Sequence, residues 1–217
     1  MNLAQAASAA FGSVPIRVLP PGHRLPDDAD EARALLLEVA ASGEAILSLA
    51  PALPTAAFSR RDTLLPGYAA AAQAVTAHGF APVVRPVGGH LAIYDEGSLV
   101  LHLAAPHPQA KEQITARFEV FARSMADALS QWGIDARVGA VPGEYCDGAY
   151  SVNAAGRRKL IGTGQRIVRG AYLFSAVVMV TAGEPLRSAL AEAYDRLGLA
   201  FDPATVGAVA DELGDLR

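Results

Sequence analysis

The chain has 217 residues, of which 52% are hydrophobic and 18% charged, and its 18 basic and 22 acidic side chains give a net charge of −4. This length suits one domain with a sizeable core, and the hydrophobic content excludes a largely disordered chain. The sequence holds no block of Lys and Arg of the kind that binds nucleic acid, so the charges predict no DNA or RNA partner.

Cysteine usage and apolar runs indicate the compartment. Cys146 is the only cysteine, which excludes an internal disulfide and fits a reducing environment. The first residues lack the basic start of a secretory signal. The longest apolar run, residues 171–180, is about half as long as a bilayer-spanning helix must be. These features predict a soluble, cytoplasmic protein with no membrane partner.

In the first half of the chain, helical and strand patterns follow an N-terminal arm over residues 1–27, which is expected to be irregular or an edge element. Apolar residues at helical spacing predict helices, and short apolar runs between turn residues predict strands. The expected elements are a helix over 30–41, a strand over 45–49, a helix over 66–78, a strand over 82–85, and a hairpin of strands 91–94 and 99–103.

The second half begins with the longest helical pattern, in which Phe118, Phe121 and Met125 recur at core spacing. Residues 171–180 are the strongest candidate for a central strand. The expected elements are a helix over 111–132, strands over 149–152, 160–168 and 171–180, and helices over 186–197 and 203–213.

This order of elements predicts the fold class. Two β-meander patterns, over 79–103 and 143–180, accompany the helices, and no repeat or linker divides the chain. We therefore expect an α+β fold with a mixed, largely antiparallel sheet flanked by helices. The whole chain is predicted to be a single domain, with its core over residues 28–217.

Several common sites are missing from the sequence. It contains no GxxxxGK[ST] phosphate loop, no GxGxxG motif after a strand, no HExxH and no GxSxG. The spacing of His102 and His107 fits no standard zinc site. We expect no metal centre.

Two glycine-rich segments remain as candidate sites. In the first, Arg85 precedes Gly88, Gly89 and His90 at the end of a predicted strand. Adjacent glycines let the backbone approach a ligand closely, although a tight turn without a ligand also explains them. The second segment, residues 142–166, carries the single cysteine.

Cys146 and Lys159 are the candidate reactive side chains of this second segment. Cys146 lies among glycine, tyrosine and aspartate rather than in an apolar element, and a basic cluster follows it, which favours a thiolate. Lys159 is one of only two lysines in an arginine-rich chain. A lysine offers a compact charge whose pKa shifts readily on burial. The alternatives are an inert cysteine and a solvated hairpin lysine.

The ordered motifs resemble a known superfamily. Residues 84–103 and 142–180, with Gly-x-x-Lys-x-x-Gly-x-x-Gln beginning at Gly156, resemble the biotin/lipoate-protein ligase catalytic domain, and the resemblance extends over about residues 60–197. It is closest to the amidotransferase branch, the octanoyl-[GcvH]:protein N-octanoyltransferases. Its residues here include Arg85, Gly88, Gly89, Cys146, Gly148, Tyr150, Lys159, Gly162 and Gln165.

The resemblance implies an activity and roles for these residues. It implies transfer of an octanoyl or lipoyl group to a lysine of lipoyl domains, namely those of 2-oxoacid dehydrogenase complexes and the glycine cleavage H protein. Cys146 would carry the acyl group as a thioester, Lys159 would contact the acyl carbonyl, and the other residues would bind substrate, His90 among them. No cofactor is expected for this transfer.

Some positions depart from the family pattern. Asp147 replaces a proline beside the nucleophile, one residue is inserted before Lys159, and His90 and His102 stand where apolar or small residues are usual. A carboxylate at Asp147 would raise the thiol pKa unless it faces away. Two alternatives stay open: a lipoate-protein ligase that uses ATP with Mg, and a non-catalytic protein that binds acyl chains or lipoyl domains on the same fold.

Overall fold

Two β-sheets form the frame of the molecule. The computed structural model describes residues 15–20 and 28–214. The large sheet has seven strands in the order β1 (Ile16–Val18), β2 (Ala45–Pro51), β6 (Ser98–Pro106), β10 (Ala171–Met179), β9 (Arg158–Val168), β8 (Val152–Ala154) and β7 (Ala136–Val138). The small sheet has three, in the order β4 (Ala81–Val84), β3 (Thr55–Phe58) and β5 (Ala92–Tyr94).

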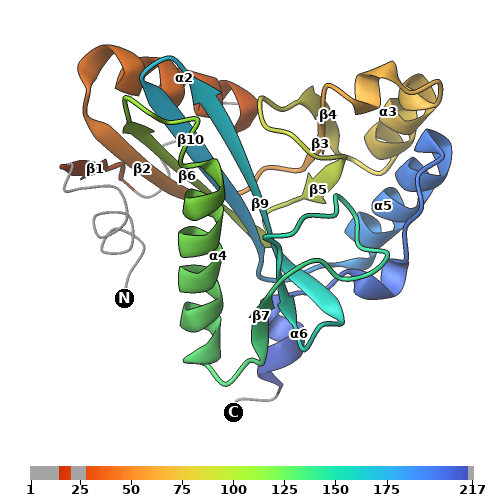
Figure 1. The fold of residues 1–217 in the computed structure, drawn as a ribbon. Helices are drawn as coiled ribbons and strands as arrows, with labels where there is room; N and C mark the ends of the chain where they lie inside the picture. The colour runs from red at the N-terminus through yellow and green to blue at the C-terminus, as the bar shows by residue number, and fades with distance from the viewer. Residues whose placement is uncertain (1–14, 21–27, 215–217) are drawn as a thin grey trace.

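Helices cover both sheets (Figure 1). α2 (Asp28–Ser42) and α4 (Ile114–Ser130) pack on opposite faces of the large sheet, since α2 meets Leu173 and α4 meets Phe174 of the same strand. α3 (Tyr68–Ala77) and α5 (Glu184–Leu197) lie against each other and the small sheet. The remaining helical elements are η1 (Asp62–Leu64), η2 (Pro203–Thr205) and α6 (Val209–Leu213).

Side-chain periodicity explains these elements. On α4, Phe121, Met125 and Leu129 repeat every four residues and are buried, so that one stripe of the helix joins the core. α5 ends at Gly198, whose φ of 68° is the left-handed conformation that glycine adopts without strain. None of the helices in the described ranges, 15–20 and 28–214, is long and apolar enough to cross a bilayer.

The predicted fold class is confirmed. Most neighbouring strands of the large sheet are antiparallel, the pairs β1–β2 and β3–β4 are parallel, and β8, β9 and β10 form the expected meander. β10 lies at the centre of the seven-stranded order, as its apolar sequence predicts.

The predicted hairpin over 91–103 is wrong. β5 pairs with β3 in the small sheet, whereas β6 pairs with β2 and β10 in the large sheet. Gly97 explains the separation, because its carbonyl accepts hydrogen bonds from Val180 and Thr181 and a Cβ here would lie 2.3 Å from the Thr181 hydroxyl. The turn at Gly97 therefore leads the chain from one sheet to the other.

Two other boundaries differ from expectation. The helix predicted over 203–213 is broken into η2 and α6, because Gly207 N–H bonds to the Lys159 carbonyl and lies flat against β9. The strand predicted over 149–152 begins at Val152, because the turn before it is held by hydrogen bonds from Gly148 and Ser151 to Glu144.

Three short strands, β1, β3 and β7, were expected only in part or not at all. Within the N-terminal arm, which the sequence predicts to be irregular or an edge element, Ile16–Val18 is an edge strand, and the rest of the arm lies mostly outside the described residues. The patterns do not predict β3 and β7, of which β3 is rich in alanine and β7 has only three residues.

Candidate active site

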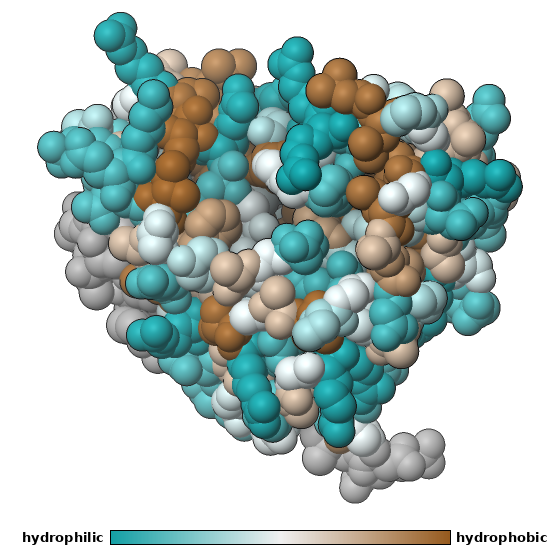
Figure 2. All heavy atoms as spheres, turned by 45° about the vertical axis from the view of Figure 1, so that its right-hand side comes forward, coloured by the Kyte–Doolittle hydropathy of each residue, from teal (hydrophilic) through white to brown (hydrophobic). Residues whose placement is uncertain are grey.

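A cavity of about 480 Å³ is lined by residues of both sheets. Figure 2 shows hydrophobic residues on both sides of a hollow in the upper part of one face. Every sequence-predicted site residue except His90 lines the cavity: Arg85, Gly88, Gly89, Cys146, Gly148, Tyr150, Lys159, Gly162 and Gln165. Residues from separate segments of the chain are thus brought to one site.

Cys146 is held in an uncommon backbone conformation. Its φ is 44°, a left-handed value that costs about 1–3 kcal/mol for a residue with a side chain. Two buried side chains fix this conformation: the Cys146 N–H donates to the Tyr194 hydroxyl at 2.6 Å, and Lys159 Nζ donates to the Cys146 carbonyl at 2.7 Å. Both backbone polar groups of the cysteine are therefore satisfied.

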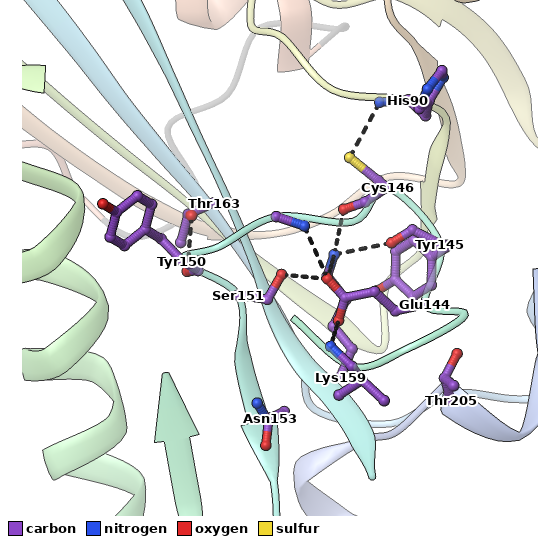
Figure 3. A network of polar contacts seen from close by, with 12 residues as sticks. His90, Glu144, Tyr145, Cys146, Tyr150, Ser151, Asn153, Lys159, Thr163 and Thr205 are labelled. Carbon is purple, nitrogen blue, oxygen red and sulfur yellow. Dashed lines mark hydrogen bonds and ion pairs between the residues drawn. The ribbon is translucent and has the colours of Figure 1, made fainter. Parts of the chain in front are cut away.

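The Cys146 sulfur faces the glycine-rich segment (Figure 3). Arg85 Nη2 donates to Sγ at 3.1 Å, and the His90 backbone N–H donates at 3.3 Å. Gly89 has a φ of 100°, and a Cβ on it would lie 2.6 Å from Sγ and 2.8 Å from Arg85. The segment is therefore more than a turn: it needs glycine because the sulfur and the guanidinium occupy the space of a side chain.

These contacts set the pKa of the thiol. Burial of Cys146 by itself raises the pKa, but the charges of Arg85 and Lys159, with the hydrogen bonds from Arg85 and His90, outweigh burial. The net effect lowers the pKa below the ordinary value, which favours the nucleophilic thiolate. Asp147 lines the cavity, and the largest influences on the thiol pKa come from burial, Arg85, Lys159 and His90.

Lys159 is a buried residue, not a solvated one. It is 1% exposed, and its Nζ donates to Glu144 Oε1, the Tyr145 carbonyl and the Cys146 carbonyl at 3.3, 3.0 and 2.7 Å. An ammonium has three N–H groups, so all of them are used. To contact an acyl carbonyl, Lys159 would have to exchange one of these partners.

Comparison with family models shows which known proteins this chain is related to. The model of the lipoyl protein ligase A/B catalytic domain matches residues 39–215, most of the chain. The chain belongs to this family.

Two curated proteins with similar sequences are both named octanoyl-[GcvH]:protein N-octanoyltransferase. That of Geobacillus kaustophilus is 29% identical over 144 residues, which are 66% of this chain and 50% of the relative. That of Exiguobacterium sibiricum is 30% identical over 156 residues, 72% of this chain and 56% of the relative. The chain spans about half the length of the curated relatives it matches.

Solved structures of ligases share the fold. Protein Ta0514 of T. acidophilum with bound lipoic acid superposes with a TM-score of 0.60 at 16% identity, over 93% of this chain and 92% of that one. Lipoate-protein ligase A bound with ATP gives a TM-score of 0.59 at 16% identity, over 92% of each chain. At this identity the likeness concerns the fold alone.

The other predicted residues shape the lipoyl protein ligase A/B site in different ways. Tyr150 stacks on Phe118 with ring centroids 5.0 Å apart and forms part of the cavity wall. Gln165 accepts from Arg117 and donates to the Ile114 carbonyl, so that it also ties β9 to the start of α4. Gly162 leaves room for Lys159, whose Cε would lie 3.4 Å from a Cβ there.

His90 contributes its backbone rather than its ring. The ring does not line the cavity, and its Nδ1 lies 2.7 Å from Asp62 Oδ1, which is fully buried. Arg85 Nη2 donates to the His90 carbonyl. Asp62 thus anchors the residue whose N–H meets the sulfur.

Sequence reasoning missed three residues of this family site. Glu144 is buried and joins Val141, Gly148, Ser151 and Lys159 through its carboxylate (Figure 3). Tyr194 and Asp62 lie on α5 and η1, far from the motifs in sequence. Of these three residues, only Glu144 could have been suspected from the sequence, because it lies two residues before Cys146. Among residues 15–20 and 28–214, no group of three His, Cys, Asp or Glu side chains is arranged to hold a metal.

Proposed function

We propose that this protein transfers an octanoyl or lipoyl group between lysine residues of lipoyl-carrying proteins, through a thioester on Cys146. The observation that supports the proposal most directly is the Cys146 sulfur, which has a lowered pKa and points into a cavity between a guanidinium and a backbone N–H. The names of the curated relatives supply the acyl group and the carrier, GcvH.

In the first step, the thiolate of Cys146 attacks the acyl carbonyl of the donor. The C–N bond to the donor lysine breaks, the leaving nitrogen takes up a proton, and the acyl group stays on sulfur as a thioester. Arg85 and the His90 N–H contact the attacking sulfur, so they lie beside the carbon it attacks. We assign them to the developing oxyanion, where such donors contribute about 3–4 kcal/mol.

In the second step, the neutral amine of the acceptor lysine attacks the thioester. It loses a proton, the thiolate leaves, and Cys146 is regenerated, so that the two steps balance in protons. Exchange of one lysine amide for another is close to neutral in free energy, so no nucleotide is needed. Lys159 holds the Cys146 carbonyl and lowers the thiol pKa by its charge. Its contact with the acyl carbonyl stays a prediction.

An ATP-dependent ligase reaction is the alternative, since a ligase with bound ATP shares the fold. The described residues that line the cavity include one arginine and one lysine, Arg85 and Lys159. Both are engaged with the Cys146 loop, so neither is free to bind a triphosphate. This arrangement favours the transferase.

Acyl transfer without ATP tests the proposal. The protein is incubated with octanoylated GcvH and followed by intact mass, where a gain of one octanoyl group that hydroxylamine removes is expected. Addition of an unmodified lipoyl domain should then move the group to its lysine. The Cys146→Ser variant should gain no hydroxylamine-labile group. Transfer that strictly requires ATP, or that persists in Cys146→Ser, would sink the proposal.

A further inference from the structure

A row of polar side chains crosses the α2-facing side of the large sheet. Ser48 on β2, His102 on β6 and Ser175 on β10 are direct cross-strand neighbours, and they are 3%, 6% and 9% exposed. His102 Nδ1 lies 2.9 Å from Ser175 Oγ, and the Ser48 hydroxyl donates to the buried carboxylate of Glu31 on α2. Four polar side chains thus form one buried line.

The rows on either side of this line are apolar. Ala50, Val100 and Val177 form the row nearer Gly162, and Ala104 pairs with Leu173 in the row beyond. A buried sheet face is normally apolar throughout, because a buried polar group is stabilising only where it is hydrogen-bonded. A polar row between apolar rows therefore suggests a role in binding.

The strand register defines how far the polar row lies from Gly162 and Lys159 in the cavity. His102 and Ser175 both line the cavity, whereas Ser48 and Glu31 stand behind them. Ser175 is two residues along β10 from Val177, whose partner Gly162 packs beside Lys159. Two residues of a strand advance roughly 7 Å, the reach of about five bonds of an extended acyl chain. The row therefore meets the far end of an acyl group whose carbonyl is at Cys146.

We propose that His102 and Ser175 recognise the far end of the acyl group and select a lipoyl group over an octanoyl group. The proposal deepens the proposed function and rests on it for the position of the acyl carbonyl. We assign the tautomer in which the Nδ1–H of His102 donates to Ser175 Oγ, because this contact then occupies an acceptor site of the hydroxyl and leaves its single O–H as a donor. The sulfur atoms of a dithiolane ring begin at about the sixth carbon and are weak, polarisable acceptors. A saturated chain end would cover the hydroxyl without offering it a partner.

Competition between the two acyl groups tests this selection. The wild-type protein receives equal amounts of lipoylated and octanoylated carrier without ATP, and intact mass measures which group appears first on Cys146. We expect lipoyl to be loaded about five- to tenfold faster, the effect of one or two modest hydrogen bonds. The double variant His102→Leu/Ser175→Ala should lose this preference or reverse it. Equal or faster loading of octanoyl by the wild type overturns the proposal, as does a preference that survives in the double variant.

Two further variants control for unspecific effects of losing a buried hydroxyl and for unfolding of the double variant. Ser124→Ala removes a buried serine hydroxyl on α4 that does not line the cavity and bonds to the Val120 carbonyl, so it should keep the wild-type preference. Ser175→Ala alone is the smaller change if the double variant unfolds, and it should still reduce the preference.

Binding separates this proposal from the proposed function. Calorimetry with lipoamide and octanamide on the Cys146→Ser variant needs no transfer step. Tighter binding of lipoamide together with no acylation of the wild type would support the recognition row and refute the thioester mechanism. Equal binding of the two amides would refute the row.

Discussion

Cys146 is a residue whose backbone is fixed from both ends while its sulfur stays reachable. The N–H is held by Tyr194, the carbonyl by Lys159, and the side chain lines the cavity. Because the strained φ is imposed by two buried partners, the sulfur is presented in one orientation. The lowered pKa of the thiol and this fixed orientation are the two features on which the proposed nucleophilic role of Cys146 rests.

Arg85 should control the ionisation of this thiol. In Arg85→Met, the burial that raises the Cys146 pKa remains, while the largest opposing charge is lost. The pKa should therefore rise above its wild-type value, and the thiolate should appear only at higher pH. The rate of iodoacetamide alkylation as a function of pH measures this midpoint. Arg60→Met, which changes an exposed arginine, should leave the midpoint in place, and an unchanged midpoint in Arg85→Met would contradict the assignment.

Gly89 should tolerate no side chain. In Gly89→Ala, the new Cβ would occupy the space of the sulfur and of Arg85, and a displacement of about 1 Å costs roughly a hundredfold in rate. Alkylation and transfer should both fall by that order. Gly79→Ala is the matched control, because Gly79 also has a positive φ, 89°, but no atom lies within 4 Å of its Cβ position. Equal losses in the two variants would attribute the effect to backbone strain alone.

The residues that sequence could reveal are those with a local signal. Cys146 stands out as a single cysteine in a polar loop, and Lys159 as a rare lysine, and both lie in the cavity. The contacts of Tyr194 and Asp62 depend on segments that meet only in the folded chain, with Tyr194 48 residues from Cys146. No periodicity or composition can predict such a pairing.

At the scale of elements, the Cys146 loop is attached to α5 by one hydroxyl. Tyr194→Phe leaves the Cys146 N–H without an acceptor and the Leu91 carbonyl without this donor, each costing about 1–3 kcal/mol. We expect a lower midpoint in urea unfolding and slower alkylation of Cys146. Tyr68→Phe, which removes a hydroxyl from a partly buried ring, should change stability by less than about 0.5 kcal/mol. Wild-type alkylation in Tyr194→Phe would show that the hydroxyl does not position the loop.

Lys159 and Glu144 join β9 to the same loop as a buried ion pair. Lys159→Met leaves the Glu144 carboxylate buried without its cation, which should destabilise the protein by about 3–5 kcal/mol in chemical denaturation. The double variant Lys159→Met/Glu144→Gln should recover part of that loss, because the uncompensated charge is gone. Lys111→Met, at an exposed lysine, should be close to neutral. A double variant no more stable than Lys159→Met would argue against charge as the cause.

The sequence predicts which segments are helices or strands better than it predicts which strands pair with each other. Apolar runs identify β5 and β6, but their short connection suggests a hairpin, whereas each strand pairs in a different sheet. The contact between Gly97 and residues 180–181 decides the outcome, and it joins positions more than eighty residues apart. Local patterns contain no information about such a contact.

At the scale of the whole molecule, the division into two sheets creates the cavity. The large sheet supplies Gly162, His102 and Ser175, and the segment between β4 and β5 of the small sheet supplies Arg85 and Gly89. The predicted α+β class is correct, but the expectation of one sheet did not include the second, three-stranded sheet, which contributes β5 to the cavity wall. The cavity therefore depends on a topological detail that composition and periodicity do not specify.

The burial of Lys159 has a consequence for the proposed thioester mechanism. The chain contains two lysines, and with Lys159 enclosed and fully hydrogen-bonded, Lys111 is the one side-chain amine exposed to solvent. Arginine, whose guanidinium stays protonated and is a poor nucleophile, provides the remaining positive charge. In the proposed mechanism, a thioester on Cys146 would therefore meet one competing lysine on the protein's own surface, Lys111, which would limit acylation of the protein by itself before an acceptor lysine arrives.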